Sequence, residues 1–344
     1  MSEADAVKNP DTEKERSSAV SLDIVIPVFN EEKVIGQLFE RLRNVFCEKN
    51  RIKNHLERVR YIIVDDGSTD CSAEIISRYI KDGFPAVLYR FSRNFGHQNA
   101  VAAGLEQADA DAVAVIDADL QDPPEIIFQM LEKRRQGYDI VHGIRKKRKE
   151  NFLKVSAYWL FYRFLSFISE IDIPLDSGDF SLLDKRALEA VKSLPEKLRY
   201  PRVLRAWVGF RQVSVAYDRP ERAAGKPKYS FSSLYKLATD GVASASIRPL
   251  KISQVFSLFY LFLVTILAFV FFYQIVFKNT ADQTFVWFMI GYLLIALGGL
   301  VQVFCIYILS AYIGRSYLEI KGRPSYIIME VVKKEENLKK SGRS

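Results

Sequence analysis

Cysteine and histidine are scarce in this sequence, which has three of each among 344 residues. Cys47, Cys71 and Cys305 are far apart in the chain and odd in number, which argues against a disulfide framework and against a zinc site. The first 20 residues are polar and charged and lack the apolar core of a signal peptide. We therefore expect residues 1–20 to form a disordered tail that stays in the cytosol.

Two common nucleotide-binding motifs are also missing. No Gly-X-Gly-X-X-Gly follows the first predicted strand, and no Walker A sequence occurs, so the standard dinucleotide-binding and P-loop classes are excluded. The net charge of +8 and the pI of about 9.2 suit an anionic partner, such as a phosphate, a nucleic acid or an acidic lipid surface. Nucleic acid is disfavoured, because the positive charge clusters near long apolar segments.

Predicted strands and helices alternate through the first part of the chain. Apolar runs at 22–28, 59–64, 86–91, 112–116 and 138–143 predict strands, and residues 34–45, 99–108 and 125–136 predict helices. This alternation predicts an α/β fold with a parallel, doubly wound sheet. Ligands of such sheets bind at the carboxyl ends of the strands.

The strand at 112–116 is followed by alternating polar residues, Asp117, Asp119 and Gln121. In an extended backbone, side chains two residues apart project to the same side. Two carboxylates and an amide oxygen would then face one small volume, which suits a hard divalent cation that shares phosphate ligands. For this motif alone, the alternative is a solvated acidic turn before Pro123 and Pro124.

Polar residues also follow the first three predicted strands. Pro27, Phe29 and Glu31 could face a base or ribose, although the glutamate could equally favour a helix N-terminus. Asp65 and Asp66 begin a sequence, Asp-Asp-Gly-Ser-Thr-Asp, that is either a capped turn or a site for a nucleoside. In the loop after the third strand Arg93 could hold a phosphate, whereas we interpret His97 as a loop residue because its sequence neighbours supply no partner.

The second half of the chain combines cations with apolar or aromatic residues. A basic run at 145–149 precedes an aromatic helical stripe at 152–168, which fits a membrane interface or a core helix equally well. Gly178 predicts a sharp turn, beside which Asp179 could approach a reacting group or cap the turn. The loop 225–230, Gly-Lys-Pro-Lys-Tyr-Ser, could grip a phosphate or be a solvated basic surface, and 232–246 predicts a second amphipathic helix.

Two long apolar runs, 252–277 and 285–313, contain no charged residue. Each exceeds the roughly 20 residues that a helix needs to span a bilayer. Basic residues flank the pair: Arg248 and Lys251 precede it, and Arg315, Lys321 and Arg323 follow it. The positive-inside rule therefore places both flanks and both termini in the cytosol, with the connector 278–284 outside. We expect the tail after Glu330 to be disordered.

Five segments in order, followed by two apolar helices, resemble the family 2 glycosyltransferases, whose nucleotide-sugar-binding fold is called GT-A. The segments are Val-Ile-Pro-Val-Phe-Asn-Glu at 25–31, Val-Asp-Asp-Gly-Ser-Thr-Asp at 64–70, Ser-Arg-Asn-Phe-Gly at 92–96, Asp-Ala-Asp-Leu-Gln-Asp-Pro-Pro at 117–124 and Ser-Gly-Asp-Phe at 177–180. The order looks most like the polyisoprenyl-phosphate glycosyltransferases, which include bactoprenol glucosyltransferases and dolichol-phosphate mannose synthases. The resemblance covers about residues 20–330.

Carried over residue by residue, the resemblance implies a nucleotide site lined by Pro27, Phe29, Glu31, Asp65, Asp66 and Arg93. It implies that Mg²⁺ or Mn²⁺ and the donor diphosphate are held by Asp117, Asp119 and Gln121. Asp179 joins the two acids as a catalytic candidate that would orient the acceptor side or a cationic partner. Candidate cations for the lipid phosphate or the donor diphosphate are Arg145, Arg202, Arg222 and Lys226. Pro227 departs from the family's usual Gly-X-Ser-Lys-Tyr loop and removes a hydroxyl and an N–H.

The resemblance implies five regions in the chain. They are a tail at 1–20, a GT-A domain at 21–230 with an interfacial helix at about 151–169, a juxtamembrane helix at 231–250, two transmembrane helices within 251–314 and a cytosolic tail at 315–344. It also implies an integral protein of the bacterial inner membrane and a homo-oligomer, with a tetramer as one candidate.

We expect inverting transfer of a hexose to a polyisoprenyl phosphate at the cytosolic membrane face. The first candidates are UDP-glucose as donor and undecaprenyl phosphate as acceptor, and the alternative is transfer of mannose from GDP-mannose. A processive polysaccharide synthase is less favoured, because the nearest stretch, residues 202–207, does not match Gln-X-X-Arg-Trp. An inactive membrane scaffold would not need acids at three strand ends.

Overall fold

The computed structural model describes residues 19–145, 177–196, 200–218, 248–277 and 284–334. The chain divides into two compact units. The first, which we call the sheet unit, comprises residues 1–157, 173–229 and 324–344, and the second, the helical unit, comprises residues 158–172 and 230–323. Of the predicted regions, the interfacial helix at 151–169 and the juxtamembrane segment up to residue 247 lie outside the described residues.

The sheet unit is built on one mixed sheet of eight strands in the order β7-β5-β6-β4-β1-β2-β3-β8. β2, β1 and β4 run parallel to one another, as do β3 and β2 and also β7 and β5, while β6 and β8 run antiparallel to their neighbours. The predicted, mostly parallel sheet is confirmed. The strands are β1 (Val20–Val28), β2 (Leu56–Asp65), β3 (Ala86–Phe91), β4 (Ala112–Val115), β5 (Ile140–Arg145), β6 (Ser177–Asp184), β7 (Gln212–Tyr217) and β8 (Ile328–Lys333).

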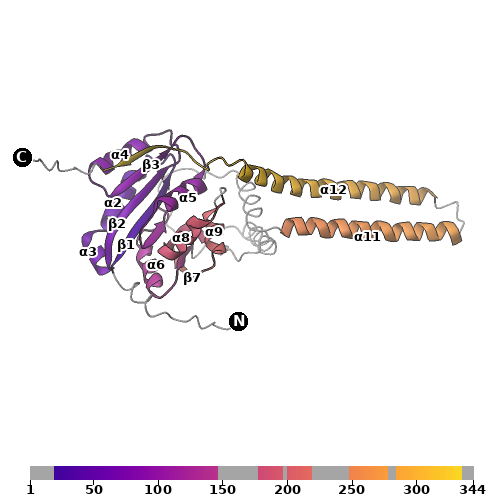
Figure 1. Cartoon of the computed structure of the whole chain (residues 1–344), viewed down its shortest axis with the longest axis horizontal. Helices are drawn as coiled ribbons and strands as arrows, with labels where there is room; N and C mark the ends of the chain where they lie inside the picture. Colours follow the sequence, from indigo (N-terminus) through magenta and orange to yellow (C-terminus); the bar gives the residue numbers. More distant parts are fainter. Residues whose placement is uncertain (1–18, 146–176, 197–199, 219–247, 278–283, 335–344) are drawn as a thin grey trace, which may run out of the picture. The chain divides into compact units, whose positions relative to one another are not determined.

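Helices cover both faces of the sheet and make a three-layer unit (Figure 1). One face is covered by α2 (Ile35–Val45), α4 (Ser72–Lys81) and α6 (Ile126–Arg135). The other is covered by α5 (His97–Gln107) and α8 (Lys185–Ser193), and the short α9 (Pro201–Trp207) packs beside α8. The small α3 (Glu48–Lys53) precedes β2 and buries none of its residues.

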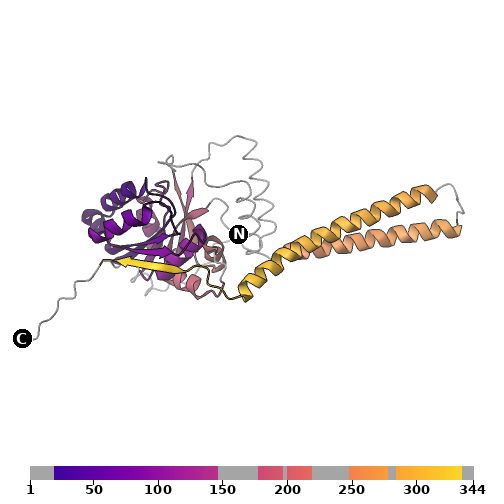
Figure 2. The same cartoon turned by 90° about the horizontal axis from the view of Figure 1, so that it is seen from above.

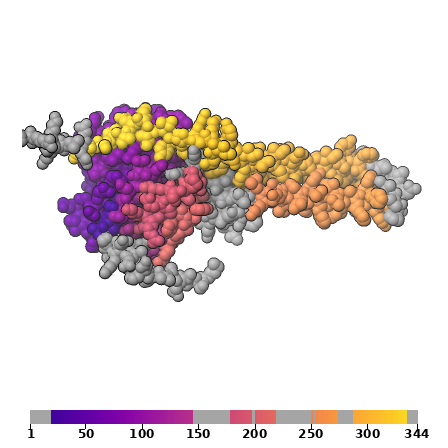
Figure 3. All heavy atoms as spheres, in the orientation of Figure 1, coloured from indigo at the N-terminus to yellow at the C-terminus, as the bar shows by residue number. Residues whose placement is uncertain are grey.

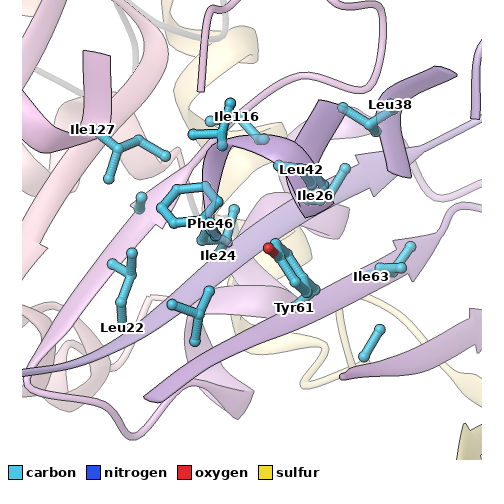
Figure 4. Close-up of a cluster of buried hydrophobic side chains, with 14 of the residues drawn as sticks. Leu22, Ile24, Ile26, Leu38, Leu42, Phe46, Tyr61, Ile63, Ile116 and Ile127 are labelled. Carbon is cyan, nitrogen blue, oxygen red and sulfur yellow. The ribbon is translucent and has the colours of Figure 1, made fainter. Parts of the chain in front are cut away.

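The period-2 pattern of the strands explains the two buried layers. In β1, Leu22, Ile24 and Ile26 point to the α2 face, whereas Val25 points to the α5 face. Figure 4 shows the first three with Leu38 and Leu42 of α2 in the larger cluster. Each fully buried aliphatic side chain contributes roughly 1.5–3 kcal/mol to the stability of the fold. This core therefore holds the strands, and the residues at their ends, in place.

The C-terminal segment differs from its prediction. Residues 328–333, which include part of the tail expected to be disordered, form β8 and pair antiparallel with β3 at the edge of the sheet. Figure 2 shows this strand along the sheet, and Figure 3 shows its atoms on the surface of the sheet unit. Tyr326 stacks on Phe91 with ring centroids 4.9 Å apart and donates to Glu106 at 2.5 Å. This strand was not predicted because its exposed side chains mix the apolar Met329 and Val331 with Glu330 and Lys333, and its partner β3 is far away in the chain.

The helical unit contains two long apolar helices, α11 (Arg248–Phe277) and α12 (Thr284–Ile320). Within them, Ser253–Tyr273 and Trp287–Ile320 are long and apolar enough to cross a membrane, and none of either stretch is buried inside the protein. The helices contact each other, and Tyr260 donates to the backbone oxygen of Leu294 at 2.8 Å. Both predicted apolar helices are present, although α12 continues beyond residue 313.

Candidate active site

Acidic side chains meet at the edge of the sheet where the parallel strands end. β2 ends in Asp65 and β4 leads into Asp117, while β6 runs in the opposite direction and brings its beginning to the same edge. Ser181 pairs with Val115, so two more residues of this antiparallel register place Asp179 opposite Asp117. Asp65 and Asp117, which are 52 positions apart, and Asp179, which is 62 positions beyond Asp117, thus share one edge; the alternating strands and helices predicted this for the first two.

The predicted metal ligands lie on a turn, and the expectation of an extended strand there is wrong. β4 ends at Val115, and Leu120 has a φ of +62° in the left-handed region. Asp119 accepts from the backbone N–H of Gln121 at 3.1 Å, which closes the turn. The turn forms because the sheet hydrogen bonds stop after Ile116, whose N–H donates to Val25.

Asp122 connects this turn to β7 by hydrogen bonds. Its carboxylate accepts from the backbone N–H of Asp117 at 3.3 Å and from the hydroxyl of Tyr217, on β7, at 2.7 Å. Asp122 is 3% exposed, so these bonds form in a buried place. The sequence alone did not pair Asp122 with Tyr217, since they are 95 residues apart.

The turn has the properties of a site for a hard cation. Oδ1 of Asp117 is buried and accepts no hydrogen bond among the described residues. Burial, together with repulsion from Asp122, Asp179 and Asp119, raises the pKa of Asp117, and His97 opposes this shift. A divalent cation would relieve that repulsion, and Asp117, Asp119 and Gln121 offer only oxygen ligands.

The protein side chains alone do not form a complete metal cage. Within the described ranges, no group of three His, Cys, Asp or Glu side chains is placed to hold a metal ion. Mg²⁺ commonly uses one or two carboxylates and takes its other ligands from water and substrate phosphates. The residues present therefore fit a cation that arrives with a diphosphate.

Asp65 and Asp66, at the end of β2, have different environments although both are buried. Asp65 accepts from the N–H of Ser68 at 3.1 Å, and its other oxygen accepts no hydrogen bond but lies 3.4 Å from Nε of Arg90. Burial raises the pKa of Asp65 despite the Ser68 bonds and Arg90. An acceptor oxygen is thus available at the strand end, which suits an N–H of a base.

Asp66 fixes the loop between β3 and α5. Its two oxygens accept from the side chain of Asn94 at 3.0 Å, from the N–H of Phe95 at 2.7 Å and from the N–H of Gly96 at 3.0 Å. Gly67, at φ +69°, lets the chains approach closely, since a Cβ there would lie 2.4 Å from the carbonyl carbon of Arg93. Asp66 therefore has a structural role in addition to the nucleotide-binding role predicted for it.

The other predicted nucleotide residues surround this strand end. Pro27 is buried within β1 opposite Val64, while Phe29 and Glu31 follow the strand and are partly buried. The N–H of Glu31 donates to Ser72 at 2.9 Å, which ties the β1 end to α4. The guanidinium of Arg93 lies 3.9 Å from the ring centre of Phe95 and is exposed.

The carboxylate of Asp179 accepts four side-chain hydrogen bonds from the described residues. It accepts from Nε and a terminal nitrogen of Arg202 at 2.8 and 3.0 Å, from Nε2 of His97 at 3.1 Å and from the side chain of Gln98 at 3.0 Å. Although burial alone would raise it, Arg202 and His97 hold the pKa of Asp179 well below its usual range. Gly178 lies within β6, so the sharp turn predicted there is absent.

Arg205 supports Asp179 through the backbone. It is fully buried and donates to the carbonyl oxygens of Gly178 and Asp179 and to the hydroxyl of Ser181. Burial lowers the pKa of Arg205 to about 10. Because Arg202 and Arg205 are both on α9, this helix sets the position of Asp179 from two sides.

His97 belongs to the site, and its interpretation as a loop residue without a partner is wrong. Its Nε2 lies 3.1 Å from Asp179 and 3.6 Å from Oδ1 of Asp117. Burial opposes charge on the imidazole, but Asp179 and Asp117 outweigh it and raise the pKa of His97 to about 9. Neither acid is a sequence neighbour of His97, so local sequence could not identify these partners.

The remaining predicted cations cannot be placed around the site. Arg145 ends β5, but its side chain lies outside the described residues, as do Arg222 and Lys226 entirely. Of the four candidates for a phosphate, the structure therefore positions Arg202 alone, and it places this guanidinium against Asp179.

The mixed, mostly parallel sheet and the acids at its carboxyl edge are the arrangement expected of a GT-A-type glycosyltransferase. Glycosyl transferase family 2 matches residues 23–192. An uncharacterized glycosyltransferase of Bacillus subtilis, YkcC, is 39% identical over 91% of this chain and 95% of its own. A prophage bactoprenol glucosyl transferase homolog of Escherichia coli is 35% identical over 91% of this chain and 100% of its own.

A solved glucosyl-3-phosphoglycerate synthase of Mycobacterium tuberculosis, in complex with Mn²⁺ and uridine-diphosphate-glucose, is 19% identical, with a TM-score of 0.43 over 70% of this chain and 83% of its own. The chain belongs to the family 2 glycosyltransferases. It is therefore a glycosyltransferase with two apolar helices that could span a membrane.

Proposed function

We propose that this protein transfers a glucosyl group from a nucleotide sugar, with UDP-glucose as the first candidate, to a polyprenyl phosphate. The observation that carries the proposal is the meeting of Asp117 with Asp179 and Arg202 at one sheet edge. One side of this edge offers oxygen ligands for a cation with a diphosphate, and the other offers a guanidinium held in place. Relatives named bactoprenol glucosyl transferase support the choice of sugar and lipid.

The proposed reaction is a single displacement at the anomeric carbon. A phosphate oxygen of the acceptor forms the new bond to this carbon while the bond to the nucleoside diphosphate breaks, so the configuration inverts. A cation bound by Asp117, Asp119 and Gln121 would neutralise charge on the leaving diphosphate. The acceptor phosphate is already anionic at neutral pH, so the reaction needs no strong general base.

The bonding of Asp179 supports this mechanism. A carboxylate that accepts four hydrogen bonds and has a lowered pKa is a poor proton acceptor. It is well suited to orient Arg202, which can stabilise a phosphate by charge-assisted hydrogen bonds. Catalysis would then depend on positioning and charge stabilisation.

The direct test uses the purified full-length protein with undecaprenyl phosphate and a panel of UDP-glucose, UDP-N-acetylglucosamine and GDP-mannose. We expect a glucosylated lipid and free UDP, with inversion visible in the proton coupling at the anomeric carbon. Faster transfer from GDP-mannose would select the mannosyltransferase alternative. Lipid product from none of the donors would contradict the proposal.

The acceptor phosphate has four candidate cations, Arg145, Arg202, Arg222 and Lys226, and the variant Arg222→Ala tests one of them. If Arg222 binds the lipid phosphate, Arg222→Ala should weaken the dependence on polyprenyl phosphate and leave nucleotide-sugar affinity unchanged. The loss should be roughly tenfold to a hundredfold, as one charge-assisted hydrogen bond is worth roughly 1.5–3 kcal/mol. If Arg222→Ala has no effect on either substrate, the acceptor phosphate belongs to Arg202 or Arg145.

We also propose that the sheet unit and both termini face the cytosol, because basic residues flank the apolar helices on those sides. In a variant that lacks the three native cysteines, a cysteine at Thr280 should react with an impermeant reagent in intact cells. A cysteine at Ser341 should react only after lysis. The opposite pattern would refute this orientation.

A further inference from the structure

His97 occupies a bridging position between two chain segments that carry the chemistry. It is the first residue of α5 and follows Gly96, whose φ is +100°. Its Nε2 faces Oδ2 of Asp179 at 3.1 Å on one side and Oδ1 of Asp117 at 3.6 Å on the other. A carboxylate can only accept, so Nε2 is the donor in the bond to Asp179.

The backbone that carries His97 is held in place. Asp66 accepts from the N–H groups of Phe95 and Gly96, immediately before the histidine. Gln98, the next residue, donates to the same oxygen of Asp179 as His97 does, at 3.0 Å. The beginning of α5 therefore delivers two adjacent side-chain donors to one carboxylate 81 and 82 residues away.

These bonds complete a continuous polar connection across the site. Asp66 at the β2 end orders the loop, the loop places His97 and Gln98, and these hold Asp179, which also holds Arg202. Asp117 lies beside His97, so the turn proposed to hold the cation is in reach of the same imidazole. Without His97, Asp179 would keep Arg202 and Gln98 but lose its donor on the side that faces Asp117.

We propose that His97 is a positioning residue of the transfer reaction, which sets Asp179 and Arg202 relative to the turn of Asp117. The inference rests on the proposed function and adds a residue to it. His97 acts through Asp179 and Arg202, so its removal should impair the chemical step and the use of the acceptor. Donor binding should be spared, because the strand end at Asp65 and the turn at Asp119 remain.

The experiment compares His97→Ala with His97→Gln in the full-length enzyme, with kcat, both KM values and the melting temperature measured for each. We expect His97→Ala to lower kcat roughly tenfold to a hundredfold, or to raise the acceptor KM by that factor. The donor KM should stay within about twofold. The glutamine amide can reach Asp179, so His97→Gln should recover most of the loss.

His55 provides a matched control, because it is exposed and precedes β2 at the opposite end of the strand. It has a φ of +51°, which asparagine tolerates, so His55→Asn should leave all four quantities unchanged. Unchanged kcat and acceptor KM in His97→Ala would overturn the inference. An equal loss in His97→Gln, with a lower melting temperature in both variants, would do the same, since it would indicate a merely structural part.

A double-mutant cycle provides a second readout. If His97 acts through the Asp179–Arg202 pair, the variant with both His97→Ala and Arg202→Ala should be little slower than Arg202→Ala alone. Multiplied effects would contradict the inference. If His97→Ala fails to fold, the same cycle with His97→Asn and Arg202→Ala decides the matter by the same criterion.

The proposed function can fail independently. A wild-type enzyme that transfers nothing to polyprenyl phosphate would refute the proposed acceptor. The variants are then compared on hydrolysis of the nucleotide sugar by water, which also requires the leaving diphosphate at the Asp117 turn. Equal hydrolysis by His97→Ala and wild type would overturn the positioning part of His97.

Discussion

Acidic side chains gather both where the parallel strands of the sheet begin and where they end. The two groups of acids differ in their hydrogen-bond partners. At the edge where the parallel strands begin, Asp23 is fully buried and accepts from Arg60 and from the N–H groups of Asp109 and Ala110. Asp184 similarly accepts a hydrogen bond from Nε of Arg134 at 2.7 Å. At the edge where these strands end, Asp117 and Asp65 each keep a buried oxygen without a hydrogen bond among the described residues.

The difference separates acids that hold the fold from acids that are available to a ligand. A carboxylate with all its partners stabilises the folded state, and removing it leaves those partners unsatisfied. Burial and neighbouring acids destabilise a charged carboxylate and raise its pKa. A bound cation or hydrogen-bond donor removes this cost. Asp65 and Asp117 therefore keep an oxygen available to a ligand at the carboxyl edge, beside the fully bonded Asp179, whereas Asp23 and Asp184 secure the other edge.

The largest expected effect comes from removing an acid at the carboxyl edge. Asp119→Ala should reduce transfer by roughly a thousandfold, the scale on which a preorganised electrostatic contact acts. The melting temperature should change little, because the loss of the bond from Gln121 is offset by the loss of repulsion at Asp117. Excess chelator should abolish the activity of the wild type, and Mg²⁺ or Mn²⁺ should restore it. Full activity in chelator or in Asp119→Ala would remove the distinction between the edges.

At the edge where the parallel strands begin, we expect a variant to lose stability and keep its activity. Asp23→Ala should lower the free energy of unfolding by about 3 kcal/mol, because it leaves Arg60 with the exposed Asp109 alone and removes the acceptor of two backbone N–H groups. The activity of each folded molecule should be unchanged. The exposed Asp82 is a suitable control, and Asp82→Ala should change stability by less than about 0.5 kcal/mol. A specific loss of kcat in Asp23→Ala would show that this edge also serves the reaction.

An effect that appears only at acidic pH comes from His142, which is buried in β5 between the two edges. Burial and the nearby Arg205 lower the pKa of His142 to about 4. Nε2 pairs with Oε1 of Gln212 at 2.8 Å, while Nδ1 is buried and has no hydrogen-bond partner among the described residues. A second proton would therefore have no acceptor.

Since the folded pKa lies below the ordinary value of 6.5, the unfolded chain binds more protons between these values. The contribution of His142 to stability is complete above pH 6.5 and should be lost as the pH falls toward 4, by up to about 3 kcal/mol. Thermal unfolding measured against pH should show this slope, and His142→Gln should flatten it. An equal slope in both proteins would assign the acid sensitivity to other groups.

The smallest expected effect concerns β8. Tyr326→Phe keeps the stack on Phe91 but removes the bond to Glu106, so it should cost about 1 kcal/mol. The control Glu106→Gln should cost a similar amount, and the double variant should cost no more than either one. A change in donor KM without a change in stability would instead connect this edge strand to the nucleotide site.

The sequence by itself predicted the sheet, the two apolar helices and most of the acids at the strand ends. These follow from local patterns: apolar runs of period 2, helical spacing, and the acids placed directly after Val64 and Ile116. The sequence pattern offered Asp179 as a candidate, and the family resemblance assigned roles to Asp179 and Arg202 without showing how they meet. Both were expected near the reaction, and their mutual bonds came only with the structure.

The tertiary structure decided the contacts between distant segments. It turned the backbone at Leu120, made a strand of residues 328–333, and brought His97, Gln98, Asp179 and Arg202 to one point. None of these follows from a local pattern, because β6 is inserted antiparallel beside β4 and its register alone sets which residue faces Asp117. Local sequence determines where a strand begins and ends, whereas strand order and register, fixed by burial of the whole core, determine which side chains meet.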